Sequence, residues 1–134
     1  MSSETILVVD DDQEIVGAIA AALEKEGFRV LRAYDGMEAL DKALDPDLRL
    51  ILMDVMMPRL DGLSAVLRIR ERRNLPIIVL SAKSEESDKV LGLSMGADDY
   101  VTKPFNPMEV MARVITSSYS GSLKAMKFLR LSLM

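Results

Sequence analysis

Short apolar runs that end in a polar residue are the feature that most constrains the fold of this chain. Ile6–Val9 precede Asp10, Leu50–Met53 precede Asp54, and Ile77–Leu80 precede Ser81. The segments between these runs carry apolar residues at helical spacing, and strands that alternate with helices form parallel sheets. The pattern therefore predicts an α/β fold with a doubly wound, five-stranded parallel sheet.

The expected secondary structure fills residues 5–118. Strands are expected at about Thr5–Asp10, Phe28–Ala33, Leu48–Asp54, Pro76–Ser81 and Asp99–Thr102. Residues at helical spacing predict three helices between these strands, with the faces Ile15, Ile19, Ala22 and Leu23 (ending near Gly27); Met37, Leu40 and Leu44; and Leu63, Val66, Leu67 and Arg70. A further helix is expected at Ser84–Met95. A last helix is expected to begin after Asn106 as its cap, with Pro107 in the first position. Residues 1–118 are thus predicted to form one domain, followed by a tail or truncated linker at 119–134.

The tail differs in composition from the rest of the chain. Tyr119–Ser122 interrupts the repeating pattern, and Leu123–Met134 mixes apolar residues with Lys124, Lys127 and Arg130 but has no acid. As a helix, this segment would carry a basic stripe suited to a partner or a membrane surface. A loose terminus, a truncation scar or a continuation of the last helix is the favoured alternative, since termini are commonly loose.

The composition favours one small cytoplasmic domain and a hard metal ion. The 134 residues are 49% hydrophobic, and no apolar run approaches the ~20 residues that span a bilayer, so no membrane contact is expected from the domain. The absence of cysteine suits the cytoplasm, and the absence of histidine leaves carboxylates as metal ligands. Carboxylate ligands favour Mg²⁺, with Mn²⁺ as the other candidate. The net charge of −4 argues against direct nucleic-acid binding.

The polar residues that follow the strands form a candidate site. Asp10, Asp11, Asp54, Ser81 and Lys103 all follow predicted strands, and ligands of open parallel sheets bind at the carboxyl ends of the strands. Three acids, a hydroxyl and an amine suit a divalent cation and a phosphoryl group. Asp54, alone at the end of a central strand, is the best candidate for the nucleophile.

Other acids near the strand ends are expected to be ordinary loop or capping residues. These are Asp12, Asp45, Asp47 and Asp61.

Four segments together resemble the receiver domain of bacterial response regulators, and the last of them resembles the OmpR/PhoB subfamily. They are Ile6–Asp12, Leu52–Pro58, Ser81-Ala82 and Gly96–Phe105. The resemblance implies strand order 2-1-3-4-5 and a signalling module rather than an enzyme, although it can catalyse its own phosphorylation and dephosphorylation. Asp54 would accept a phosphoryl group from a sensor histidine kinase.

The resemblance also implies roles for further residues. Asp11, Asp54 and the Met56 carbonyl would bind Mg²⁺ directly, Asp10 would act through water, and Lys103 would hold a phosphoryl oxygen. Ser81 and Tyr100 would switch conformation on phosphorylation and control output, which in the full-length family is commonly transcription. From the sequence alone, Tyr100 is equally well explained as a half-buried aromatic residue of an edge strand.

The subfamily forms homodimers through its fourth helix, fifth strand and fifth helix. Charged residues at this face would be Lys89, Asp99, Glu109 and Arg113, and apolar contacts would come from Leu93 and Met111. Ser94 and Ile115 replace a charged pair that is common in the subfamily, which predicts a weaker dimer. No winged-helix DNA-binding domain follows in the 134 residues, so a receiver-only protein and a truncated regulator both remain open.

Two other functions fit part of the pattern. A haloacid-dehalogenase-type phosphatase also uses an aspartate nucleophile, and Asp12 supplies an acid two residues after Asp10; against it, Asp98 and Asp99 precede Lys103 rather than follow it. A flavodoxin-like nucleotide or flavin binder needs a small-residue phosphate loop where this chain has Asp10–Asp12. Steady hydrolysis of a phosphate ester would favour the phosphatase, and stoichiometric labelling of Asp54 would favour the receiver.

Overall fold

The computed structural model describes residues 4–54, 62–81, 99–102 and 107–118. In chain order the elements are β1 (Thr5–Val9), α1 (Gln13–Lys25), β2 (Arg29–Ala33), α2 (Gly36–Lys42), β3 (Leu48–Asp54), α3 (Gly62–Arg70), β4 (Ile77–Ser81), β5 (Asp99–Thr102) and α5 (Pro107–Ser118). The predicted strands agree with these bounds to within a residue. The helix expected at Ser84–Met95, the cap Asn106 and the tail lie outside the described residues.

The strands form one parallel sheet in the order β2-β1-β3-β4-β5, which confirms the predicted fold and strand order. β1 pairs with β2 on one side and with β3 on the other, so the direction of winding reverses beside β1. In a doubly wound sheet this switch point is where ligands bind, at the carboxyl ends of the strands.

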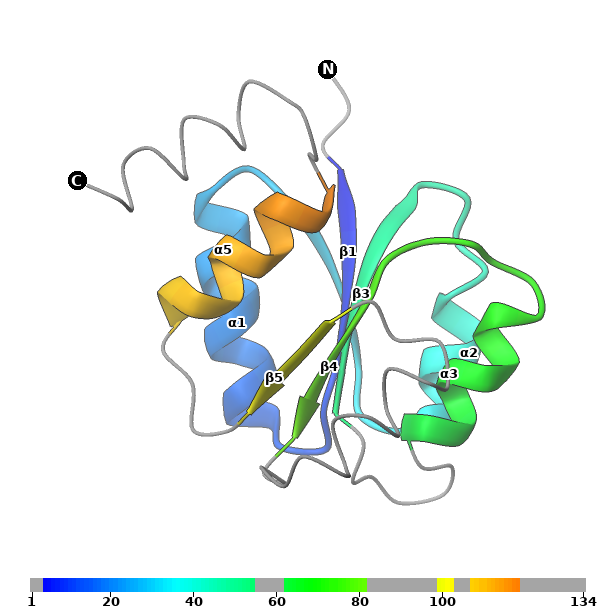
Figure 1. Ribbon diagram of the computed structural model, residues 1–134. Helices are drawn as coiled ribbons and strands as arrows, with labels where there is room; N and C mark the ends of the chain where they lie inside the picture. The colour runs from blue at the N-terminus through cyan, green and yellow to red at the C-terminus, as the bar shows by residue number, and fades with distance from the viewer. Residues whose placement is uncertain (1–3, 55–61, 82–98, 103–106, 119–134) are drawn as a thin grey trace.

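Helices cover both faces of the sheet: α1 and α5 lie on one face, and α2 and α3 on the other (Figure 1). Neighbouring strand residues point to opposite faces and are buried on both, as parallel sheets require. Ile6, Leu50 and Ile78 pack on the α1/α5 side, whereas Leu7, Ile51 and Ile77 belong to the core on the other side. The near-continuous apolar runs of the sequence are therefore explained by a sheet enclosed between two helical layers.

Helix α1 begins and ends at residues whose local chemistry favours a helix boundary. The Asp12 side chain accepts hydrogen bonds from the N–H groups of Glu14 (3.0 Å) and Ile15 (3.4 Å), which caps the first turn. Gly27, at φ +96°, then takes a left-handed conformation that side chains disfavour and turns the chain into β2.

The face that α1 buries differs slightly from the predicted one. It comprises Val16, Ile19, Ala20 and Leu23, while Ile15 and Ala22 are only half-buried.

The predicted buried faces of α2 and α3 are partly wrong. On α2, Gly36 and Ala39 face the core, whereas Met37 is 44% exposed and Leu44, just beyond the helix, is 55% exposed. On α3, Val66 is buried as predicted, but Leu67 is 46% exposed. Small residues at the sheet side allow the helices to approach closely, and the larger residues are then left toward solvent.

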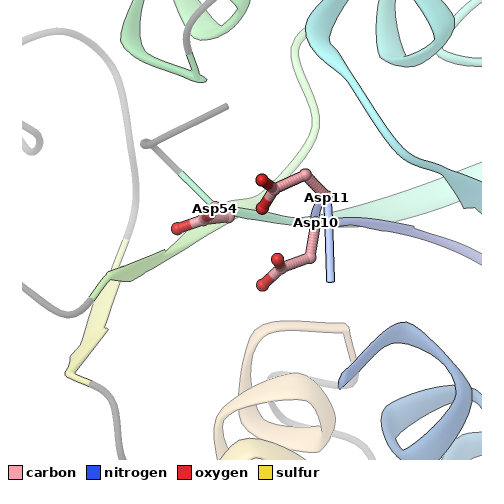
Figure 2. Close-up of side chains that lie close together, drawn as sticks. All are labelled: Asp10, Asp11 and Asp54. Atoms are coloured by element: carbon pink, nitrogen blue, oxygen red, sulfur yellow. The ribbon is translucent and has the colours of Figure 1, made fainter. Parts of the chain in front are cut away.

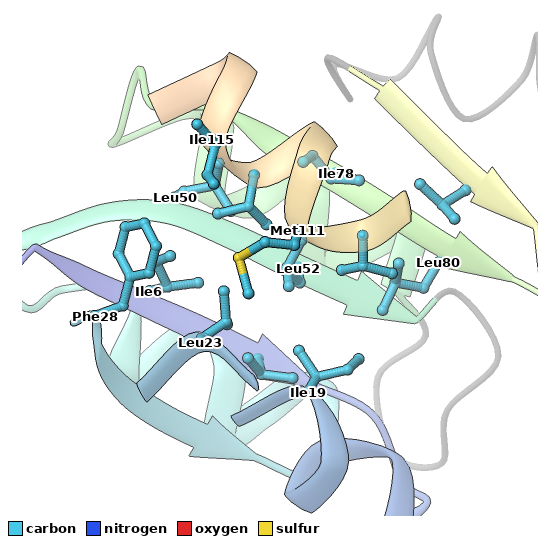
Figure 3. Close-up of a cluster of buried hydrophobic side chains, with 14 of the residues drawn as sticks. Ile6, Ile19, Leu23, Phe28, Leu50, Leu52, Ile78, Leu80, Met111 and Ile115 are labelled. Carbon is cyan, nitrogen blue, oxygen red and sulfur yellow. The ribbon is translucent and has the colours of Figure 1, made fainter. Parts of the chain in front are cut away.

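Met111 on α5 was expected at a dimer face, and this expectation is wrong. Its side chain is only 5% exposed and packs in the core with Leu23 of α1 and Leu52 of β3 (Figure 3). Val110, Val114 and Ile115 are buried on the same side of α5. Met111 therefore stabilises the monomer and has little surface left for a partner.

Candidate functional site

Asp10 and Asp11 follow directly after β1. The Asp10 N–H donates to the Ala33 carbonyl oxygen at 3.2 Å, which extends the pairing of β1 with β2 by one residue. The Asp12 N–H donates to Asp10 Oδ1 at 2.9 Å and orients that carboxylate. Asp10 is 0% exposed, whereas Asp11 lies at the surface.

Asp54 is the last residue of β3 and is 3% exposed. In the ladder between β1 and β3, Val9 is opposite Met53, so the residues that follow each of them emerge side by side. One carboxylate oxygen each from Asp10, Asp11 and Asp54 lies within 4.8 Å of the other two (Figure 2). The structure thus brings together the three acids of the predicted site.

This cluster has the chemistry of a cation site. Like charges at such distances repel, and the repulsion is stronger where two of the carboxylates are removed from water. A divalent cation relieves the repulsion, and oxygen ligands without any imidazole or thiolate suit hard ions such as Mg²⁺. A carboxylate of the same cluster is also available as a nucleophile.

Strand register brings another predicted residue to the same edge. Asp54 is opposite Leu80 on β4, so Ser81 ends its strand one residue further along, and Ser81 is in turn opposite Thr102 on β5. Lys103, which follows Thr102, and Met56 lie outside the described residues.

The structure describes part of the predicted dimer face. Asp99 and Tyr100 are in β5, opposite Ile78 and Val79, and only their backbone is described. On α5, Glu109 is exposed in the first turn and Arg113 is half-buried one turn later. Lys89 and Leu93 lie outside the described residues.

Two acids near the site have structural roles. Asp12 caps α1, in agreement with its expected role, but its backbone bond to Asp10 was not predicted. Asp35, 7% exposed after β2, accepts from the Glu38 N–H at 2.8 Å, and the Tyr34 N–H donates to the Glu38 carboxylate at 3.2 Å. The spacing of Asp35 and Glu38 matches a capping box, which is the signal that sequence reasoning missed.

Comparison with known proteins agrees with this geometry. Residues 6–115 match the family model described as "Response regulator receiver domain". The alkaline phosphatase synthesis transcriptional regulatory protein PhoP of Bacillus subtilis (strain 168) is 51% identical over 113 residues, which cover 84% of this chain and 47% of PhoP.

Solved receiver structures have the same fold. The receiver domain of the Francisella response regulator 1452 superposes with a TM-score of 0.79 at 40% identity, covering 84% of this chain and 93% of that one. This chain also superposes on a chain of the co-crystal structure of the Saccharomyces cerevisiae histidine phosphotransfer signalling protein Ypd1 with the receiver domain of its downstream response regulator Ssk1. The TM-score is 0.80 at 26% identity, covering 87% of this chain and 89% of that one.

The chain belongs to the response regulator receiver domain family. It is a two-component signalling module, and relatives such as PhoP confirm the resemblance to OmpR/PhoB-type transcriptional regulators. Nothing in these comparisons supports the phosphatase alternative. The chain spans about half the length of the curated relatives it matches. Among the described residues, no helix is long and apolar enough to cross a membrane.

Proposed function

We propose that this domain accepts a phosphoryl group on Asp54 from a phosphohistidine of a sensor histidine kinase. The observation that carries the proposal is the buried Asp54 carboxylate within 4.8 Å of the Asp10 and Asp11 oxygens, at the switch point of the sheet. The chain has no histidine or cysteine that could compete as the acceptor.

In the transfer, an Asp54 carboxylate oxygen attacks phosphorus and the bond from phosphorus to the donor nitrogen breaks. The electron pair of that bond stays with the imidazole of the donor. Asp54 is well suited to this step because β3, paired on both sides, fixes its backbone. Such positioning, with electrostatic stabilisation, is the main source of catalysis in phosphoryl transfer.

Receiver domains generally depend on Mg²⁺, and the three carboxylates fit that ion. Asp11, Asp54 and the Met56 carbonyl would bind it directly and Asp10 through water, with Mn²⁺ as a possible substitute. When bound, the ion supplies positive charge that neutralises the phosphoryl oxygens. The Asp12 N–H supports this arrangement by holding Asp10 Oδ1 at 2.9 Å.

Phosphorylation would alter the surface through residues beside the acceptor. Ser81 and Lys103 would each bind a phosphoryl oxygen, and Tyr100 would move with Ser81. The resulting change would favour homodimers through Lys89, Leu93, Asp99, Glu109 and Arg113, without the contribution once expected from Met111. The proposed output is transcriptional control through a DNA-binding domain, and the proposed location is the cytoplasm. The receiver domain is proposed to extend over residues 1–118.

Intact mass measurement tests the acceptor directly. The protein is incubated with acetyl phosphate, with Mg²⁺ or with EDTA, and a single phosphoryl increment is expected only with Mg²⁺. Asp54→Asn should remain unlabelled, whereas the control Asp12→Asn, which keeps a capping residue two positions from Asp10, should be labelled like the parent. A full phosphoryl increment on Asp54→Asn would refute the assignment.

A further inference from the structure

Helices α2 and α3 lie on the side of the sheet opposite α1 and α5 (Figure 1). A groove of about 570 Å³ is lined by residues 37–44, in and just after α2, and by residues 68–73, at and after the end of α3. We name it the α2–α3 groove and define it by Met37, Leu40, Leu44 and Ile69, with charged residues at its rim. The groove is distant in topology from the α5 and β5 surface, and none of the residues proposed for phosphoryl transfer lines it.

The floor of the groove is an apolar seam in which Met37 and Leu44 are exposed, whereas Leu40 is half-buried and Ile69 is buried. Met37, Leu40 and Leu44 follow each other at three and four residues, the spacing that places side chains on one side of a helix. Met37 is 44% exposed and Leu44 is 55% exposed, and they are two of the four exposed large hydrophobic residues among those described. Meanwhile Ala39 is fully buried in the core on the opposite side of the same turns. The segment therefore has two apolar sides, and the described part of the monomer covers only one.

Charges of both signs surround this seam. Arg68 and Arg72 on one wall, and Asp41 and Glu71 beside them, are all exposed. The ion pairs found among the described residues involve Arg29 and Arg32, and none includes these four side chains. Two cations and two anions are thus left available around an apolar centre.

Arg73 makes the groove a fixed surface. Its guanidinium donates to the carbonyl oxygens of Ala43 (3.1 Å), Asp45 (2.9 Å) and Leu48 (3.3 Å), joining the segment after α3 to the connection between α2 and β3 and to the first residue of β3. These bonds hold Leu44 and the two walls in one arrangement, so little order has to be gained on binding.

We propose that a second copy of this chain docks on the α2–α3 groove across a two-fold axis. A rim with balanced charges is complementary to itself in such a contact, because each cation of one copy can face an anion of the other. A purely acidic partner would be repelled by Asp41 and Glu71, and a purely basic partner would be repelled by Arg68 and Arg72. The contact would place Leu44 and Met37 of the two copies at its centre, and it does not depend on phosphorylation.

Charge reversal tests the proposal by sedimentation equilibrium. All chains carry Asp54→Asn, so that phosphorylation and its dimer face do not contribute. One chain carries Arg68→Glu with Arg72→Glu, and the other carries Asp41→Lys with Glu71→Lys. Each variant alone should have a dimer dissociation constant about 10-fold higher than that of the parent, because like charges then face each other across the contact. An equimolar mixture of the two should form heterodimers at least as tight as the parent dimer.

A matched pair of leucines tests the apolar centre. Leu44→Asp should weaken association about 10-fold or more, since it buries a charge. Leu67→Asp is the control, because Leu67 is similarly exposed on α3 but does not line the groove. The proposal is overturned by a parent that stays monomeric at a few hundred micromolar, by reversed chains that fail to associate when mixed, or by equal losses in the two leucine variants.

Discussion

Replacing Asp54 by asparagine should stabilise the protein when no divalent cation is present. Asp54 and Asp10 are both buried, and their nearest acidic oxygens lie within 4.8 Å. At an effective dielectric constant of 20, two charges at that distance repel by about 3.5 kcal/mol. Asp54 makes a further interaction that an amide would keep only in part, and this loss offsets about 1–2 kcal/mol. We therefore expect the free energy of unfolding in EDTA to rise by about 1–3 kcal/mol.

Magnesium should reduce this advantage. Binding to the folded state alone stabilises a protein by about 1.4 kcal/mol when the free ligand is ten times its dissociation constant. The parent should gain this amount, whereas the variant should gain less because a neutral amide is a poorer ligand for Mg²⁺ than a carboxylate. The difference between the two proteins should accordingly shrink as Mg²⁺ is added.

Urea unfolding followed by far-UV circular dichroism measures both effects, since the chain has no tryptophan to report by fluorescence. Asp47→Asn is the matched control: the Asp47 side chain is 74% exposed, and the change should shift stability by less than about 0.5 kcal/mol. If Asp54→Asn unfolds at lower urea than the parent in EDTA, with the same slope, repulsion does not dominate this cluster. A stability difference that Mg²⁺ leaves unchanged would show that the cation binds elsewhere.

Three further substitutions probe the scaffold by the same urea assay. Asp12→Ala removes the cap of α1 and should cost about 1 kcal/mol, while Asp12→Asn should cost much less; equal values would contradict the capping role. Gly27→Ala should cost about 1 kcal/mol from backbone strain alone, since no atom lies within 4 Å of the added Cβ, and a gain would refute the left-handed turn. Met111→Ala should lower the free energy of unfolding by about 2–5 kcal/mol because it leaves a cavity in the core. An unchanged stability would show that the Met111 side chain is not buried.

The sheet could be predicted from the sequence because its strands are buried on both faces. Leu48–Asp54, for example, is a nearly continuous apolar run whose bounds match those of β3. Helix faces were harder to predict because the sheet side of α2 carries Ala39 while Met37 faces out. Hydrophobic spacing favours the larger side chain, whereas close packing against a sheet favours the smaller one.

The grouping of the three acids was predictable from the sequence, and their surroundings were less so. Strand order places Asp54 beside Asp10, and this follows from topology once the β/α pattern is accepted. The depth of burial of each acid, and the Asp12 N–H that orients Asp10, depend on the local turn after β1. Met111 was expected at the dimer face of the resembled subfamily, whereas packing against α1 buries it in the core.

The pairing of the strands also determines how the protein opens. β1 and β3, which bear the acids, have partners on both sides, whereas β2 and β5 are the edges of the sheet. Amide hydrogens of the inner strands should exchange with solvent only when the whole domain unfolds, and those of the edges through smaller openings. A cation held between β1 and β3 would therefore raise the free energy of opening at the Leu7 and Leu52 amides by its full binding free energy, and their exchange would slow accordingly. At the edge strands, the cation would slow exchange only for those openings that also separate the carboxylates. The pattern of slowed amides would therefore locate the ion without any substitution in its site.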